Sequence, residues 1–336
     1  ILYPFSLLYG LVLKIRNALY DRGVMESIEF ETSTIVVGNL SVGGTGKTPQ
    51  IEYLISLLKD DLKVAVLSRG YKRKSKGYVL ANHQSDAKIL GDEPYQFFRK
   101  FPTITVAVCE DRAYGIAQLR KLELQPDVIL LDDAFQHRKV KGGYNILLTT
   151  HNELYVDDCL LPTGNLREGA SGAKRAHIII VTKCPKDISR QERDRISLKL
   201  NLQSFQTLFF TCVEYDTNLN GGSNMDLEAL SNSKIILLTG IANPRPLVDF
   251  LNSRKIEVEH MKFPDHYNFT ASDLAKIQAR REILNTVILT TEKDYVRIPG
   301  TLEHLFYIQI KVGFIDSKSE FDNLILNYVR KNSRDR

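Results

Sequence analysis

Residues 38–48 read Gly38-Asn-Leu-Ser-Val-Gly-Gly-Thr-Gly-Lys-Thr48, follow an apolar segment and precede Pro49. An apolar strand, a glycine-rich turn and a helix opened by proline are the context of a phosphate-binding loop, or P-loop. Glycines let backbone N–H groups turn toward phosphate oxygens without Cβ clashes, and the helix N-terminus adds partial positive charge. The stretch therefore predicts a site for ATP and Mg²⁺ in an α/β fold.

The predicted nucleotide-binding residues are Ser41, Val42, Gly43, Gly44, Thr45, Gly46, Lys47 and Thr48. We expect Lys47 to reach the β- and γ-phosphates and take part in catalysis, and Thr48 to ligate Mg²⁺. The loop departs from the usual G-x-x-x-x-G-K-[ST] pattern at one position, because Ser41 stands where glycine is usual.

Around this loop, short β-branched segments alternate with helical ones. They lack a clean period of two, as is typical of strands buried on both faces. The expected strands are 34–38, 63–67, 104–108, 127–131, 145–149 and 177–182, with helices such as 49–58 and 112–122 between them. This pattern predicts a doubly wound parallel sheet sandwiched by helices, the architecture of P-loop NTPases.

A second, smaller α/β set follows the turn-rich segment 218–224. Its expected strands are 234–239, 256–263, 286–291 and 306–314, with helices from about 246, after 270 and over 319–330. Thr270 and Asp273 predict a capping box for the second of these helices. The two sets together predict a two-domain protein.

Residues 1–13 carry no charge, and Lys14, Arg16 and Arg22 follow them. Such a helix either packs on the core or lies in a membrane interface with its basic residues toward head groups. The chain has a net charge of +5, too weak to indicate a nucleic-acid partner but compatible with phosphorylated ligands or an anionic membrane surface. None of its four cysteines forms a CxxC pair, so neither a zinc site nor a disulfide framework is expected.

Two carboxylates, Asp132 and Asp133, end the apolar segment that starts at Val128. In P-loop enzymes such a strand brings an acid to Mg²⁺, although a strand-terminal aspartate is also a common helix cap. The segment Gly91-Asp-Glu-Pro94, taken alone, is typical of a helix start capped by Asp92. Val181-Thr-Lys-Cys184 is similar to the base-reading loop of GTPases, but Pro185 replaces the acid that would read guanine.

The chain resembles the lipid A 4'-kinase (tetraacyldisaccharide 4'-kinase) family from its N-terminal helix to about residue 300. The motifs that carry this resemblance are the P-loop, Leu67-Ser-Arg-Gly-Tyr71, Gly91-Asp-Glu-Pro94, Asp132-Asp-Ala-Phe-Gln-His137, Leu160-Leu-Pro-Thr-Gly-Asn-Leu-Arg-Glu168, Val181-Thr-Lys-Cys184, Phe263-Pro-Asp-His-Tyr267 and Thr290-Thr-Glu-Lys-Asp294. Serine at position 41 is shared with the family. Ala134, Asn165 and Gly169 depart from its pattern and affect only the local loop shape.

The resemblance implies transfer of the ATP γ-phosphoryl group to the 4'-hydroxyl of a tetraacylated glucosamine disaccharide 1-phosphate, a step of lipid A biosynthesis. It also implies a peripheral or monotopic position on the cytoplasmic face of the bacterial inner membrane. We expect a monomer with an N-terminal membrane-associated helix (1–30), a P-loop kinase domain (31–215) and a smaller C-terminal α/β domain (216–336). We expect no nucleic-acid partner.

Residue roles follow from the same resemblance. Asp92 is expected to be the base for the sugar hydroxyl and to pair with His266 across the two domains. The acids expected to serve Mg²⁺ or its waters are Glu93 and either Asp132 or Asp133. The residues expected to bind substrate are Tyr71, Arg112, Gln136, His137 and Arg167, with the basic loop 72–76 facing the lipid head group.

Two alternatives stay open from the sequence. One is a soluble P-loop kinase or ATPase acting on a small metabolite, which would not depend on detergent or lipid. The other is a non-enzymatic nucleotide switch, which would tolerate loss of Asp92.

Overall fold

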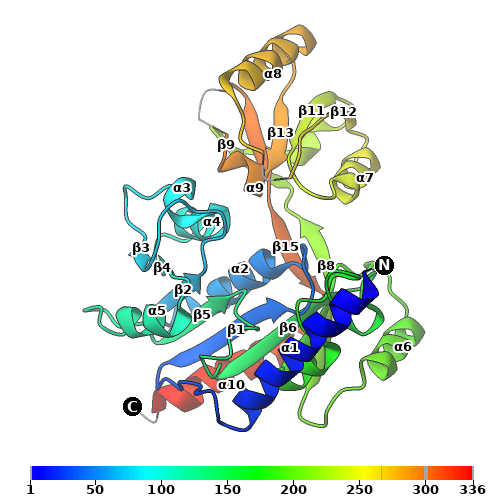
Figure 1. Cartoon of the computed structure of the whole chain (residues 1–336). Coiled ribbons are helices and arrows are strands. Elements are labelled where there is room, and N and C mark those ends of the chain that lie inside the picture. Colours follow the sequence, from blue (N-terminus) through cyan, green and yellow to red (C-terminus); the bar gives the residue numbers. More distant parts are fainter. Residues whose placement is uncertain (1, 266, 299–301, 335–336) are drawn as a thin grey trace. The chain divides into compact units, whose positions relative to one another are not determined.

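The computed structural model describes residues 2–265, 267–298 and 302–334, which form two units (Figure 1). Unit 1 contains the chain up to Val213 and again from Val312 onward, and unit 2 contains Glu214–Lys311. Each unit is built around its own sheet.

Unit 1 is organised by a nine-stranded sheet in the order β15-β8-β7-β6-β1-β5-β2-β4-β3. Its strands are β1 (Ser33–Asn39), β2 (Val64–Ser68), β3 (Val79–Leu80), β4 (Thr105–Val108), β5 (Val128–Asp132), β6 (Tyr144–Thr150), β7 (Ile178–Thr182), β8 (Thr207–Tyr215) and β15 (Ile310–Phe314). The central strand β1 pairs in parallel with both β5 and β6. The carboxyl ends of β1, β5 and their parallel neighbours therefore meet at one edge, where α/β proteins bind ligands.

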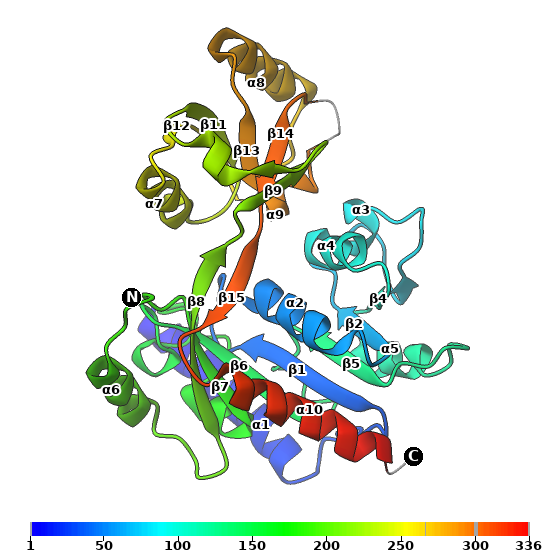
Figure 2. The same cartoon turned by 180° about the vertical axis from the view of Figure 1, so that it is seen from behind.

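Helices cover both faces of this sheet, as the sequence predicts. Along β1, Ile35 and Val37 belong to a core cluster that includes Ile51 of α2 (Lys47–Leu58), while Val36 belongs to a second cluster on the opposite face. Figure 2 views the face that carries α2 and α10. The remaining helices of unit 1 are α1 (Tyr3–Asp21), α3 (Ala87–Leu90), α4 (Asp92–Lys100), α5 (Arg112–Leu119), α6 (Arg190–Leu200), α10 (Lys318–Arg334) and the 3₁₀ turns η1 (Tyr155–Asp157) and η2 (Ala170–Arg175).

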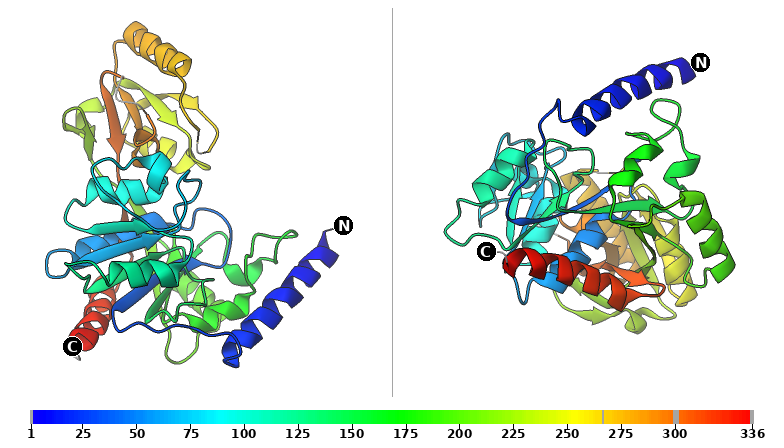
Figure 3. Two further views of the ribbon diagram at one scale, coloured as in Figure 1. Left: turned by 60° about the vertical axis from the view of Figure 1, so that its left-hand side comes forward. Right: turned by 90° about the horizontal axis from the view of Figure 1, so that it is seen from below.

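The N-terminal helix α1 lies on the outside of unit 1 (Figure 3). Most of its apolar side chains are not buried. Its two buried residues are Ser6 and Gly10. The side chains that it exposes include Phe5, Leu7, Leu8, Leu11, Val12 and Ile15. The helix therefore docks through its polar side and leaves an apolar side uncovered, which argues against the interpretation of a core helix. Among the described residues, no helix is long and apolar enough to cross a bilayer.

Unit 2 contains a six-stranded sheet in the order β10-β9-β14-β13-β11-β12. Its elements are β9 (Asn218–Gly221), β10 (Met225–Asp226), η3 (Leu227–Leu230), β11 (Lys234–Thr239), α7 (Arg245–Ser253), β12 (Glu257–Lys262), α8 (Ala271–Leu284), β13 (Ile288–Thr291), α9 (Glu292–Tyr295) and β14 (Leu305–Ile308). The predicted capping box of α8 is confirmed, because the Thr270 side chain accepts from the Asp273 N–H and the Asp273 carboxylate accepts from the Thr270 N–H.

The chain divides differently from the sequence expectation at its C-terminal end. The single strand expected over 306–314 is two strands, of which β14 lies in the sheet of unit 2 and β15 in that of unit 1. Helix α10 then buries Phe321 and Ile325 in the core of unit 1. An alternating pattern shows that a strand has two faces but not which sheet it joins, so the sequence could not assign residues 312–336 to unit 1.

Candidate active site

The P-loop connects β1 to α2 with the predicted geometry. Gly43 and Gly46 have φ angles of +107° and +90°, which L-residues with side chains rarely adopt, and Gly46 is the N-cap of α2. The Thr45 Oγ1 and Asn39 Nδ2 atoms are buried without a hydrogen-bond partner among the described residues. Buried polar atoms in native proteins are normally paired, so these atoms and the helix N-terminus fit a bound phosphate chain.

Lys47 lies between two acceptors from neighbouring strands. Its Nζ donates to Asn39 Oδ1 at 3.3 Å and is 3.7 Å from Asp133 Oδ1. Arg167 binds the same aspartate through both terminal nitrogens, at 3.0 and 2.8 Å, and also donates to Asn39. Burial raises the pKa of Asp133, but the bond from Arg167 and the charge of Lys47 outweigh it and lower this pKa overall. Asp133 therefore stays ionised and pairs with both the Lys47 ammonium and the Arg167 guanidinium beside the P-loop.

Asp132 is buried and accepts a hydrogen bond from Ser68 Oγ at 3.0 Å. Burial, followed by the nearby charges of Glu93 and Asp133, raises the pKa of Asp132 to about 7. Carboxylates that crowd together in this way are stabilised by a cation, and carboxylate oxygens are the protein ligands that Mg²⁺ takes. Among the described residues, no three His, Cys, Asp or Glu side chains are grouped to hold a metal alone. This suits Mg²⁺, which usually takes one or two carboxylates together with substrate phosphates and water.

Helix α4 starts differently from the sequence expectation. Asp92 was expected to be the cap and Pro94 the first helical residue, but the N-cap is Gly91 and Asp92 is already helical, with no side-chain cap. Gly91 has a φ angle of +91°, and a Cβ there would lie 3.1 Å from the Tyr71 carbonyl oxygen. Only glycine suits both requirements, so the loop after β2 packs directly on the start of α4 and brings two of the predicted motifs together.

Arg112 is 2% exposed and its guanidinium binds backbone carbonyls. It donates to Cys109 O at 2.7 Å and to Asp132 O at 3.3 Å. Burial lowers its pKa to about 10, against the opposing effect of the Asp132 charge. The structure thus gives Arg112 a place in holding the end of β5, and its expected role toward a phosphate stays a prediction.

The other expected substrate residues lie on loops of unit 1. Gln136 Nε2 donates to Asn39 O at 2.6 Å, so it supports the loop that follows β1. Burial, with the charges of Arg112, Arg69 and Arg16, lowers the pKa of His137 to about 4, so this imidazole is neutral. Tyr71 is exposed. His266 lies outside the described residues, and its expected role stays a prediction.

Sequence reasoning missed residues that hold the P-loop from its far side. Thr182 Oγ1 donates to Thr45 O at 2.8 Å, and Lys183 Nζ donates to Gly44 O. Sequence reasoning assigned the Val181–Cys184 motif no role at the P-loop, although its position at the end of β7 places it against this loop. Asn39 was also missed, although it is the last residue of β1 and binds both Lys47 and Arg167.

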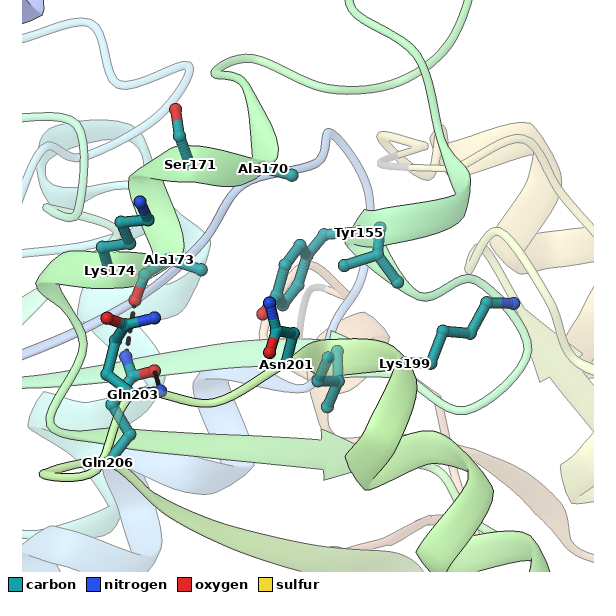
Figure 4. A pocket seen from close by; sticks show the side chains of 11 residues that line it. Tyr155, Ala170, Ser171, Ala173, Lys174, Lys199, Asn201, Gln203 and Gln206 are labelled. Atoms are coloured by element: carbon teal, nitrogen blue, oxygen red, sulfur yellow. Dashed lines mark hydrogen bonds between the residues drawn. The ribbon is translucent and has the colours of Figure 1, made fainter.

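A pocket of about 210 Å³ lies elsewhere in unit 1, among η1, η2 and the end of α6 (Figure 4). Its lining includes Tyr155, Lys174, Lys199, Asn201 and Gln206. Among the predicted site residues that the structure describes, none lines this pocket, so it is separate from the P-loop.

A glycine-rich loop after the central strand of a parallel sheet, with an acidic end on the adjacent strand, defines a P-loop nucleotide-binding protein. A family model described as LpxK, tetraacyldisaccharide-1-P 4'-kinase, matches residues 1–330. The chain belongs to this family.

Individual relatives agree over almost the whole chain. It is 50% identical to a tetraacyldisaccharide 4'-kinase of Flavobacterium johnsoniae, covering 99% of this chain and 97% of that protein. It is 45% identical to one of Bacteroides thetaiotaomicron, covering 99% and 94%. The crystal structure of an "apo" form of LpxK from Aquifex aeolicus in complex with ATP matches with a TM-score of 0.78 at 34% identity, covering 98% of both chains.

Proposed function

We propose that this protein transfers the γ-phosphoryl group of ATP to the 4'-hydroxyl of tetraacyldisaccharide 1-phosphate in lipid A biosynthesis. Family membership over the whole chain supports the reaction. The observation that carries the proposal is the placement of Lys47 between Asn39 and Asp133 at the P-loop. Phosphoryl transfer depends mainly on alignment and charge neutralisation, and this arrangement supplies both.

In the proposed mechanism, backbone N–H groups of the P-loop and Lys47 hold the ATP phosphates. When bound, Mg²⁺ neutralises charge on the β- and γ-phosphates. The residues that would hold the ion or its waters are Thr48, Glu93, Asp132 and Asp133. Arg167 fixes the Asp133 carboxylate, and Asp133 in turn keeps the Lys47 ammonium at the loop.

Asp92 is the proposed general base. A sugar hydroxyl is a weak acid, so a carboxylate must accept its proton as the new O–P bond forms and ADP leaves. Asp92 lies in the first turn of α4, where the helix N-terminus favours the ionised form of a carboxylate. The residues proposed to contact the glycolipid are Tyr71, Arg112, Gln136, His137 and Arg167.

The proposed location is peripheral or monotopic on the cytoplasmic face of the inner membrane. The exposed apolar side of α1 supports contact with a membrane surface. An amphipathic helix binds a membrane interface by burying its apolar side among acyl chains. Lys14, which is exposed on the same helix, would reach anionic head groups.

The proposal is tested by ATP turnover with and without detergent-solubilised tetraacyldisaccharide 1-phosphate, with product identified by mass spectrometry. We expect lipid-dependent turnover in the wild type and a loss of roughly 10²–10⁴-fold in kcat in Asp92→Asn, with ATP binding retained. Turnover independent of the lipid would favour a soluble ATPase. Binding without any phosphorylated product would favour a nucleotide switch.

The predicted pairing of Asp92 with His266 has its own kinetic test. If the two act as one acid–base unit, His266→Ala should also lower kcat by roughly 10²–10⁴-fold. The double variant should then be little worse than the poorer single variant, because residues acting together are not additive. Fully multiplicative losses would refute the pairing and leave the kinase assignment in place.

A further inference from the structure

The docked side of α1 binds loops that carry proposed active-site residues. Tyr9 Oη donates to the backbone oxygen of Arg167 at 2.9 Å, and Arg16 Nη2 donates to the backbone oxygen of Gln136 at 3.0 Å. Next to Arg16 in the sequence, Asn17 Nδ2 donates to Glu168 Oε1 at 2.8 Å. These bonds join positions 120 to 158 residues apart in sequence, so they fix the helix to two separate loops.

The side chains of the same two loop residues fasten the chain beside the P-loop. Gln136 Nε2 donates to Asn39 O at 2.6 Å, and Arg167 binds both Asn39 and Asp133. Asn39 and Asp133 are also the two acceptors that hold Lys47. A continuous path of direct contacts therefore runs from α1 through Gln136 and Arg167 to the phosphate-binding lysine.

The neighbouring residue Glu168 reinforces this path. It is buried and binds Arg175 through both carboxylate oxygens, at 2.7 and 2.8 Å, while accepting from Asn17. A buried carboxylate with this many partners has little freedom to move, since losing a partner leaves charge unpaired. The loop that carries Arg167 is thus fixed on one side by α1 and on the other by η2.

We infer that the polar side of α1 is a positioning element of the ATP site, with Tyr9 and Arg16 as positioning residues that act through Arg167 and Gln136. The two sides of the helix then have different roles. The exposed apolar side serves membrane contact, as proposed above, and the docked polar side sets the loops that hold Lys47. The inference rests on the proposed ATP site but not on the identity of the acceptor lipid.

The test compares two pairs of substitutions on α1. Tyr9→Phe combined with Arg16→Met removes the two donors without touching the exposed apolar residues. Its matched control is Tyr3→Phe combined with Lys14→Met, because both of these side chains are exposed. Affinity for a non-hydrolysable ATP analogue with Mg²⁺ is measured by calorimetry. Flotation is measured with liposomes of phosphatidylethanolamine and phosphatidylglycerol, and thermal melting is recorded for every variant.

We expect the Tyr9→Phe, Arg16→Met variant to bind the analogue roughly 3- to 10-fold more weakly, as expected for the loss of supporting hydrogen bonds, and to float like the wild type. The Tyr3→Phe, Lys14→Met control should keep the wild-type analogue affinity. A Leu8→Ser, Leu11→Ser variant should show the reverse pattern, with reduced flotation and unchanged analogue affinity. A Tyr9→Phe, Arg16→Lys variant keeps a donor at position 16. It should therefore bind the analogue more tightly than the Tyr9→Phe, Arg16→Met variant.

Wild-type analogue affinity in the Tyr9→Phe, Arg16→Met variant would overturn the inference. So would an equal loss of affinity in the Leu8→Ser, Leu11→Ser variant, because the effect would then not belong to the polar side. If the Tyr9→Phe, Arg16→Met variant melts well below the wild type, the analogue affinity of Tyr9→Phe alone is the deciding measurement. This substitution removes one hydroxyl group and leaves the ring in place. Analogue affinity needs no lipid, so absence of glycolipid phosphorylation would refute the proposed acceptor without affecting this result.

Discussion

Lys47 illustrates how the site is assembled from single side chains. It comes from the first turn of α2, but its two acceptors come from the ends of β1 and β5. Because three elements meet at this ammonium, its position depends on the strand order of the sheet and not only on the P-loop sequence. The charge is therefore fixed before a nucleotide arrives, which lowers the cost of ordering it on binding.

Lys47→Ala should abolish turnover and weaken Mg-ATP binding roughly 10-fold or more, because a fixed positive charge facing the phosphates disappears. The control is Lys59→Ala, at the C-cap of the same helix, where the lysine forms an ion pair with exposed Asp60. Calorimetry and a coupled kinase assay measure the two effects. A Lys47→Ala enzyme with near-normal rate and affinity would refute the assignment of the P-loop.

The lowered pKa of His137 predicts that the free energy of unfolding falls in acid. Its pKa in the folded protein lies at about 4, below the ordinary value of 6.5, mainly because burial disfavours the charged ring. A histidine with a depressed folded-state pKa stabilises the fold above its unfolded pKa and loses that contribution as pH falls through 6.5 toward 4. Comparing chemical denaturation of the wild type and His137→Gln should show the wild type losing about 1 kcal/mol more between pH 7.5 and pH 5, discounted for partial exposure. An equal change in the free energy of unfolding between pH 7.5 and pH 5 in both proteins would contradict the prediction.

The sequence predicted residues whose signal is local. The P-loop, the acidic end of β5 and the capping box of α8 each lie within a short stretch whose spacing has a direct physical meaning. Asn39, Tyr9 and Thr182 escaped prediction because their roles come from hydrogen bonds to distant segments. The Thr182 bond, for example, spans 137 positions, and no spacing rule in one sequence indicates such a partner.

At the scale of elements, helix α4 depends on one glycine. Gly91 combines a φ angle of +91° with backbone atoms of Gly70 and Tyr71 at 3.1 to 3.2 Å from the place of a Cβ. Neither neighbour is a flexible side-chain end, so the backbone itself would have to move. The start of α4 and the loop after β2 are therefore placed by the same residue, and they carry Asp92 and Tyr71.

Gly91→Ala should lower the free energy of unfolding by about 1–3 kcal/mol through backbone strain, and it should lower kcat because the start of α4 shifts. Gly222→Ala is the control, because a Cβ there meets nothing within 4 Å. Thermal melting and steady-state kinetics give the two readouts. Wild-type values of both for Gly91→Ala would show that the loop after β2 adapts without cost.

Helix α1 shows where element-scale prediction from sequence stops. The uncharged composition of residues 1–13 was equally consistent with a core helix and an interfacial one, since both need apolar residues. The structure separates the two because Phe5, Leu8 and Leu11 are exposed while Ser6 and Gly10 are buried. Composition alone cannot show that the polar side of the helix is buried and the apolar side exposed. That orientation depends on which side of the helix finds hydrogen-bond partners on the loops.

At the scale of the whole molecule, the sequence predicted two α/β units but not the path between them. The order of strands and helices in each unit follows from short apolar segments, and most predicted strands lie within one or two residues of the observed ones. The return of the chain to unit 1 at Val312 depends on which core accepts α10. That choice is made by packing between residues far apart in sequence, so a pattern of apolar spacing does not reveal it.

Because the chain returns to unit 1 at Val312, we predict that the stability of unit 1 depends on the last helix, α10. Phe321 of α10 is fully buried, with its ring 5.4 Å from that of Phe209 and 4.9 Å from that of Phe314. Phe321→Ala should therefore lower the free energy of unfolding of unit 1 by about 3–5 kcal/mol, the usual range for emptying an aromatic site in a core. Asn327→Ala, at an exposed position of the same helix, is the control. Hydrogen exchange followed by mass spectrometry should show faster exchange in β1 and unchanged exchange in β11, since these strands lie in different cores. Faster exchange confined to β11 would mean that α10 stabilises unit 2, which would contradict the observed division of the chain.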